Sequence, residues 1–153
     1  MTVSGTFDRV HFYSNTASSS RENIIEINQW GTTTWSTMKG AFYGCKNLQG
    51  SEPTDIPDLT SVTSMKYMFY NATAFNQDIG NWDVSNVTDM RRMFNDATAF
   101  NRYIGDWDMG NVTDMSLMFA GATAFNQDIG NWDVSSVNKS YMLTIYIFII
   151  NNE

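Results

Sequence analysis

The chain has a single cysteine, Cys45, and a single histidine, His11. One cysteine excludes an internal disulfide and any metal cluster built from several cysteines, and its expected role is that of a small buried residue. The two residues lie in different modules of the sequence, and no glycine-rich phosphate loop or histidine-based metal motif accompanies them. We therefore expect no catalytic residue, no metal and no cofactor. An enzyme would have to rely on carboxylates alone, as glycosidases do, so a carboxylate-based glycan-active enzyme is a remote alternative.

Positive charge is also scarce, with 9 Lys and Arg against 16 Asp and Glu and a net charge of -7 spread along the chain. This balance disfavours nucleic acid and anionic membranes as partners. The N-terminal residues have no apolar stretch of signal-peptide length, and the apolar run at 141–150 is shorter than the roughly 20 residues that span a bilayer. We expect no membrane span, and either the protein is cytosolic or this chain is a fragment of a longer protein that lacks the export signal and anchor.

A repeat is the most informative feature that is present. "NQDIGNWDVS" occurs at 76–85 and again at 126–135, and a looser copy, "NRYIGDWDMG", lies midway at 101–110. Such a fixed interval of 25 residues is typical of proteins in which one unit stacks on its own copy to bury its apolar side. Three full copies cover 63–87, 88–112 and 113–137, and a divergent copy at 35–62 matches them at an offset of 27.

The spacing of apolar residues changes within each copy. Met65, Met68, Phe69 and Ala72 are spaced as on one face of a helix, whereas the segment from Ile79 to Val84 alternates as in a strand. The pattern predicts a short helix followed by a short strand. It also predicts helix caps at Thr88 and Thr113, acidic residues in the first helical turn at Asp89 and Asp114, and positive φ angles at Gly80, Gly105 and Gly130.

The fold class that follows is an α/β repeat, a right-handed solenoid of leucine-rich-repeat type with short parallel strands on one face and short helices on the other. Strands are expected near Trp30, Leu59, Trp82, Trp107 and Trp132. Residues 1–34 are expected to form an N-terminal β cap with the first strand, including an edge strand at 5–13 and Ile24 to Ile27. Residues 138–153 are a degenerate segment, either a capping strand or a truncated reading frame.

The stretch "ATAFNQDIGNWDVSNVTDM" resembles the repeat of the BspA-like leucine-rich-repeat surface proteins, which is also found in mycoplasma-type lipoproteins of unknown function. The resemblance covers about residues 24–137, and all three full copies carry "ATAFN", "IG" and "WD". It implies a cell-surface or secreted protein that adheres to or recognises proteins or glycans of a host or neighbouring cell, without catalysis. A structural spacer within a longer surface protein is the alternative.

One column of side chains is the candidate binding site. Asp83, Asp108 and Asp133, with Ser85 and Ser135, should stack on an exposed strand face directly after the buried tryptophans. Such a column could bind calcium weakly or hold a sugar, and the alternative is a hydrogen-bonded turn or a solvated face. The tryptophans themselves belong to the core pattern. Asn86, Asn111 and Ser136 are expected to bond the backbone of a neighbouring coil.

Overall fold

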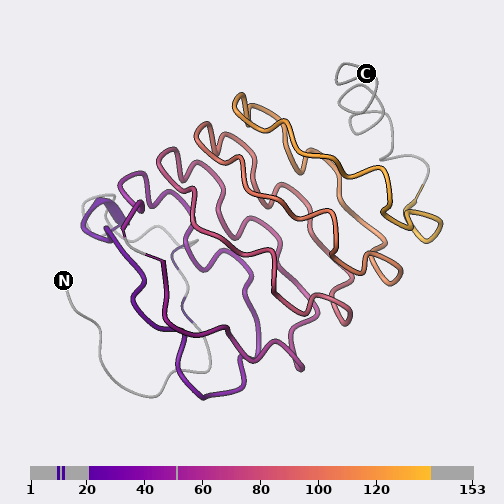
Figure 1. Cartoon of the computed structure of the whole chain (residues 1–153), viewed down its shortest axis with the longest axis horizontal. Coiled ribbons are helices and arrows are strands. Elements are labelled where there is room, and N and C mark those ends of the chain that lie inside the picture. The colour runs from indigo at the N-terminus through magenta and orange to yellow at the C-terminus, as the bar shows by residue number, and fades with distance from the viewer. Residues whose placement is uncertain (1–9, 11, 13–20, 51, 139–153) are drawn as a thin grey trace.

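A computed structural model describes residues 10, 12, 21–50 and 52–138 of the chain. Figure 1 shows the successive repeats lying side by side as a row of coils, in chain order from the indigo end to the yellow end. Among the described residues only Arg21 and Glu22 have helical backbone. Pairing of β type there is limited to isolated parallel bridges, Thr34 with Asp58, Ser64 with Asp89, and Asp89 with Asp114.

The predicted α/β solenoid of leucine-rich-repeat type is therefore wrong. The described part of the chain has no sheet, and none of the repeats contains a helix. No strand forms at Ile24 to Ile27 or at the five expected positions, Trp30, Leu59, Trp82, Trp107 and Trp132. Asp89 and Asp114, expected in the first turn of helices, lie in the bridges instead. Most of the predicted edge strand at 5–13 and all of the apolar run at 141–150 lie outside the described residues.

Each repeat is instead a succession of four-residue turns. In the copy at 63–87 the amide of Met68 donates to the carbonyl of Met65 at 3.0 Å, and the amide of Ala72 donates to that of Phe69 at 3.1 Å. The third residue of each turn, Tyr67 or Asn71, has a positive φ of 60° or 55°, which together with the hydrogen bond defines a type II turn. We call such a pair the tandem turns, and equivalent pairs occur at 38–45, 90–97 and 115–122.

The tandem turns explain the apolar pattern without a helix. The first and fourth residues of each turn are buried, while the two middle residues are more exposed except at Gly40, Gly44 and Asn95. Met65, Met68, Phe69 and Ala72 thus point inward with the 3-1-3 spacing that a helix would also give. A left-handed residue such as Tyr67 interrupts a right-handed helix, and the left-handed conformation costs a non-glycine residue about 1–2 kcal/mol.

Backbone hydrogen bonds between coils hold this unusual backbone in place. The amides of Tyr67 and Asn71 donate to carbonyls of the next coil, at Arg91 and Asn95, over 3.0 and 2.8 Å. The same ladder joins Met65 with Asp89, Phe69 with Met93, Met90 with Asp114, Arg92 with Ser116, Phe94 with Met118 and Asp96 with Ala120. The left-handed residues are therefore among those that tie the coils together, which offsets their conformational cost.

The threonines at the repeat boundaries serve the same purpose. The amide and the hydroxyl of Thr88 both donate to the carbonyl of Thr63 in the preceding coil, at 2.9 and 3.1 Å, and Thr113 does the same to Thr88. Their predicted role as helix caps is wrong, because they join two coils rather than begin a helix.

The core consists of stacked side chains, one set from each coil. Phe42, Phe69, Phe94 and Phe119 form one column, with ring centroids 5.7, 5.7 and 5.6 Å apart. Phe75, Phe100 and Phe125 form a second column, with separations of 5.8 and 5.7 Å. Trp82, Trp107 and Trp132 close the core and are only 5%, 4% and 7% exposed, so their predicted core position is confirmed.

The second half of each repeat, predicted as a strand, is also built from turns. The amide of Trp82 bonds the carbonyl of Ile79 at 3.2 Å, and that of Val87 bonds Val84 at 2.9 Å. Gly80, Gly105 and Gly130 were expected to have positive φ angles, and none of the three does. Glycine is needed at Gly105 because a Cβ atom there would lie 2.6 Å from the carbonyl oxygen of Asp128 in the next coil.

Candidate recognition surface

The three aspartates predicted as a binding column lie in turns at one edge of the stack. The Oδ1 atom of Asp83 accepts hydrogen bonds from the amide and the hydroxyl of Ser85, at 3.1 and 2.6 Å. In the next two coils Oδ1 of Asp108 accepts from the amide of Gly110 at 3.0 Å, and Oδ1 of Asp133 from the amide of Ser135 at 2.9 Å. Each carboxylate closes its own turn, and all three aspartates are exposed.

Neighbouring turns of this edge are linked directly. The side-chain amide of Asn111 donates to the carbonyl of Ser85 at 2.7 Å, and the hydroxyl of Ser136 donates to the carbonyl of Gly110 at 2.7 Å. Asn86 makes the equivalent bond to Thr60 at 3.2 Å, so the prediction that these side chains bond a neighbouring coil is confirmed. Because the turns are stacked in this way, Asp83, Asp108 and Asp133 recur once per coil along one edge. We call them the acidic column.

Hydrogen bonds favour the ionised form of two carboxylates in the acidic column, Asp83 and Asp133. The hydroxyl and then the amide of Ser85 lower the pKa of Asp83, because both donate to its charged form. Ser135 lowers the pKa of Asp133 in the same way. Hydrogen bonds within the turns thus stabilise the charged forms of Asp83 and Asp133. Among the described residues no three His, Cys, Asp or Glu side chains gather into a group that could hold a metal ion.

The single cysteine is buried beneath the tandem turns. Burial raises the pKa of the Cys45 thiol to about 12, an effect that Arg21 partly opposes, so the thiol is protonated at neutral pH. Its predicted role as a small buried residue is confirmed. His11 lies outside the described residues.

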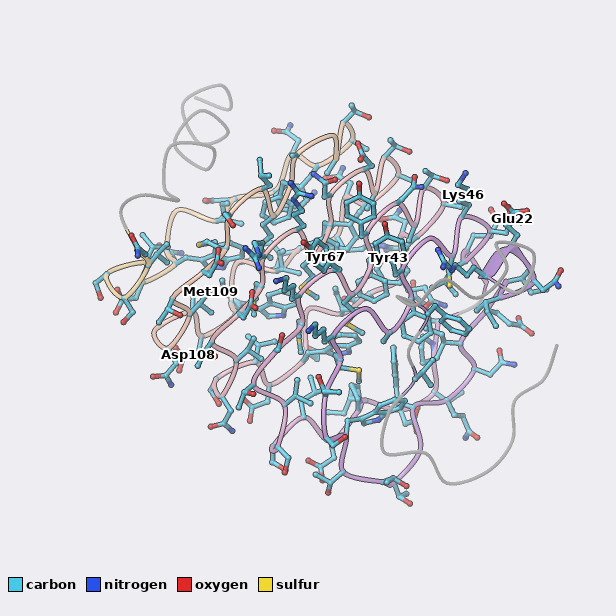
Figure 2. The ribbon with its side chains drawn as sticks, turned by 180° about the vertical axis from the view of Figure 1, so that it is seen from behind. Glu22, Tyr43, Lys46, Tyr67, Asp108 and Met109 are labelled. Carbon is cyan, nitrogen blue, oxygen red and sulfur yellow. The ribbon has the colours of Figure 1, made fainter. Side chains whose placement is uncertain are left out.

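A second surface feature was missed from the sequence. Tyr43 and Tyr70, from the outer positions of adjacent tandem turns, stack with ring centroids 4.8 Å apart and planes 3° apart, and Tyr67 packs edge-on against both. Lys66 lies 5.1 Å above the ring of Tyr67, and Arg21 lies 5.3 Å above that of Tyr43. We call these five residues the tyrosine cluster. Figure 2 labels Tyr43 and Tyr67 near the centre of the view, with Asp108 of the acidic column at its margin.

The repeat itself carried a signal for this cluster. The full copies keep their buried apolar residues except at one position, where Val84 becomes Met109 and then Val134. They differ at all four outer positions of the tandem turns: Lys66-Tyr67 becomes Arg91-Arg92 and then Ser116-Leu117. Tyr70-Asn71 likewise becomes Asn95-Asp96 and then Ala120-Gly121. The outer positions of the tandem turns are thus a part of each copy that varies while nearly all of the apolar core is maintained.

Stacked coils of 25 residues, each built from turns around a continuous apolar core, define the chain as a repeat protein without regular secondary structure in its described repeats. Residues 36–146 match the model of a family described as Mycoplasma protein of unknown function, DUF285, and the chain belongs to this family. No curated protein and no solved structure matches it. No helix in the described part of the chain is long and apolar enough to cross a membrane.

Proposed function

We propose that this chain is a non-catalytic recognition module that binds proteins or glycans of a host or neighbouring cell. The observation that carries the proposal is the acidic column, in which Asp83, Asp108 and Asp133 stand exposed at one residue per coil on turns closed by their own hydrogen bonds. A ligand with repeated hydroxyl, amide or cationic groups can bond several of these carboxylates at once, and linked contacts of this kind raise affinity.

The resemblance to the BspA-like surface proteins supports the same role and suggests a surface or secreted location. The three copies also vary at every outer position of the tandem turns, while their apolar core differs only where Val84 becomes Met109. Repeat proteins recognise partners through extended surfaces formed by neighbouring units, and such surfaces change without cost to the core when only outward side chains differ.

The experiment compares two variants of equal charge. The first changes Asp83, Asp108 and Asp133 to Asn, and the control changes Asp78, Asp106 and Asp128 to Asn. Asp78 and Asp128 also accept amide hydrogen bonds, each at 2.9 Å, from Gly80 and Gly130. Binding to immobilised glycan and extracellular-protein arrays should fall at least tenfold in the first variant and stay near the wild-type level in the control.

A structural spacer is the second candidate, and one observation favours it. The carboxylate of Asp83 already has two donors within its own turn, so the column stabilises the coil edge without any ligand. A spacer should show no array binding even as the wild-type protein. Equal loss of binding in both Asn variants would indicate a general charge effect and contradict recognition by the acidic column.

A further inference from the structure

The described residues contain cations that gather on one surface of an otherwise acidic protein. Four of the seven described Lys and Arg side chains occupy the outer positions of the tandem turns: Lys39, Lys66, Arg91 and Arg92. Lys39, Lys66 and Arg91 are the second residues of the first tandem turn in three consecutive coils. We call these three the basic column.

The basic column is surrounded by residue types that are common in protein interfaces. The three tyrosines of the tyrosine cluster lie on the tandem turns of the first two coils of this column, and tyrosine and arginine are enriched where proteins meet. The ring of Tyr43 is stacked on Tyr70 and covered by Arg21, while Lys66 lies over Tyr67, so these ring faces are already occupied. This arrangement disfavours sugar stacking and leaves cationic groups and ring edges as the contact chemistry.

The charge of Arg91 is only partly compensated within the chain. Its Nε atom lies 3.7 Å from Oδ2 of Asp114, yet makes no hydrogen bond to any described residue. The Arg91 side chain is 37% exposed. A carboxylate placed by a partner can therefore approach the rest of the guanidinium group.

The acidic column of the same protein matches the basic column in number and in spacing. Both recur once per coil, because the ladder at Met65 and Asp89 and the side-chain bond from Asn111 to Ser85 belong to the same stack. The phenylalanine columns give the separation of adjacent coils as 5.6–5.8 Å between ring centroids. Two molecules with aligned stacks would bring three carboxylates opposite three cations in register.

We propose that the basic column, with the tyrosine cluster beside it, docks the acidic column of a second copy of this chain. The two columns lie on different parts of each coil, so the contact is head-to-tail and leaves one column of each end molecule available. Association then grows with protein concentration rather than stopping at a closed dimer. The inference rests on the acidic column being a recognition surface, as proposed above, and names one of its partners.

The test is sedimentation velocity of the full chain over a concentration series, with two charge-reversed variants. One carries Lys39→Glu, Lys66→Glu and Arg91→Glu, and the other Asp83→Lys, Asp108→Lys and Asp133→Lys. Wild type should associate at ~0.1 M salt and dissociate at ~1 M, where the Debye length falls to about 3 Å. Each variant alone should sediment as a monomer, and an equimolar mixture should regain the larger species because each reversed column now complements the other.

Controls separate charge complementarity from misfolding and from the proposed function. Lys46→Glu, an exposed cation outside the basic column, should associate like wild type. If a reversed variant does not melt cooperatively, a neutral version of the same column replaces it, with Gln in the basic column or Asn in the acidic column, and either neutral variant should sediment as a monomer. Wild type that stays monomeric at every concentration, or variants that fail to complement each other, overturn the inference. Array binding by the variant with the reversed basic column tests the proposed function separately, since its acidic column is intact.

Discussion

The indole nitrogen of Trp107 donates a hydrogen bond to the carbonyl oxygen of Ile79, 28 residues earlier and one coil away, at 3.1 Å. Trp132 repeats this bond to Ile104 at 3.0 Å. The indole therefore fills the core and also satisfies a backbone carbonyl that packing has removed from water. In each full copy an aspartate directly follows this tryptophan. A buried indole and an exposed carboxylate of the acidic column are thus neighbours in the chain.

Replacing Trp107 tests this double role. Trp107→Ala should lower the free energy of unfolding by about 3–5 kcal/mol, because a buried aromatic side chain is lost from a packed core. Trp107→Phe keeps most of the apolar volume and removes only the hydrogen bond, which should cost about 1–3 kcal/mol. Urea unfolding monitored by circular dichroism measures both values. Equal and small effects would show that Trp107 does not support the core.

Gly105 and Gly130 occupy equivalent positions in two coils but differ in how closely the next backbone approaches them, which gives a second prediction. A Cβ atom on Gly105 would lie 2.6 Å from the backbone oxygen of Asp128, whereas the nearest atom at Gly130 is the movable Oδ1 of Asp128, at 3.2 Å. Gly105→Ala should therefore force two coils apart and lower the melting temperature by several degrees more than Gly130→Ala. Thermal unfolding of the two single variants decides the matter, and similar melting temperatures would contradict the close contact.

Two aspartates should affect stability with opposite signs as pH changes. Burial raises the pKa of Asp89, with a hydrogen bond from the Arg91 amide opposing it and the charge of Asp114 adding to it, whereas Ser85 lowers the pKa of Asp83. Asp89, whose pKa is raised in the folded protein, contributes stability below its unfolded pKa, and this stability is lost as pH rises through its folded pKa. Asp83, whose pKa is lowered in the folded protein, contributes stability above its unfolded pKa, and this stability is lost as pH falls through its folded pKa.

Asp89→Asn should consequently raise the melting temperature at pH 7, since Asn keeps an acceptor for the Arg91 amide without a buried charge. Asp83→Asn should lower it slightly, because the carboxylate that Ser85 stabilises is lost. The difference at Asp89 should shrink as pH falls toward the ordinary carboxyl pKa, because the raised pKa lets Asp89 bind its proton first, and the difference at Asp83 should shrink only at lower pH. Melting curves from pH 2.5 to 7 measure the crossover, and shifts of the same sign at pH 7 would contradict the assignment.

The sequence was sufficient to predict which apolar residues of each repeat are buried, the tryptophans included, because stacked copies must bury equivalent residues. It also predicted the links that Asn86 and Asn111 make to a neighbouring coil. It misled on secondary structure for a geometric reason. Two consecutive type II turns bury residues at positions 1, 4, 5 and 8, and one face of an α-helix does the same. Apolar spacing alone therefore cannot distinguish tandem turns from a helix.

A different signal in the sequence does distinguish them. The third residue of the second tandem turn is Gly44, Asn71, Asp96 and Gly121 in successive coils, and all four have positive φ. Glycine, asparagine and aspartate are the residues that best tolerate this conformation, and they are poor choices for the middle of a helix. The tyrosine cluster could not be predicted in the same way, because its contacts depend on which outer positions the stacking brings together.

Calcium provides the last test of the acidic column. Asp83, Asp108 and Asp133 each direct Oδ1 into their own turn, and no described group of three acidic side chains converges on one point. Calcium requires six to eight oxygen ligands, so we expect dissociation constants no tighter than roughly 10⁻⁴ to 10⁻³ M. Stabilisation by a ligand follows RT ln(1 + [L]/Kd), so calcium at ~10 μM should leave the melting temperature unchanged. A shift of several degrees at that concentration would mean that the turns rearrange into a cation site, and the acidic column would then act through calcium rather than through its bare carboxylates.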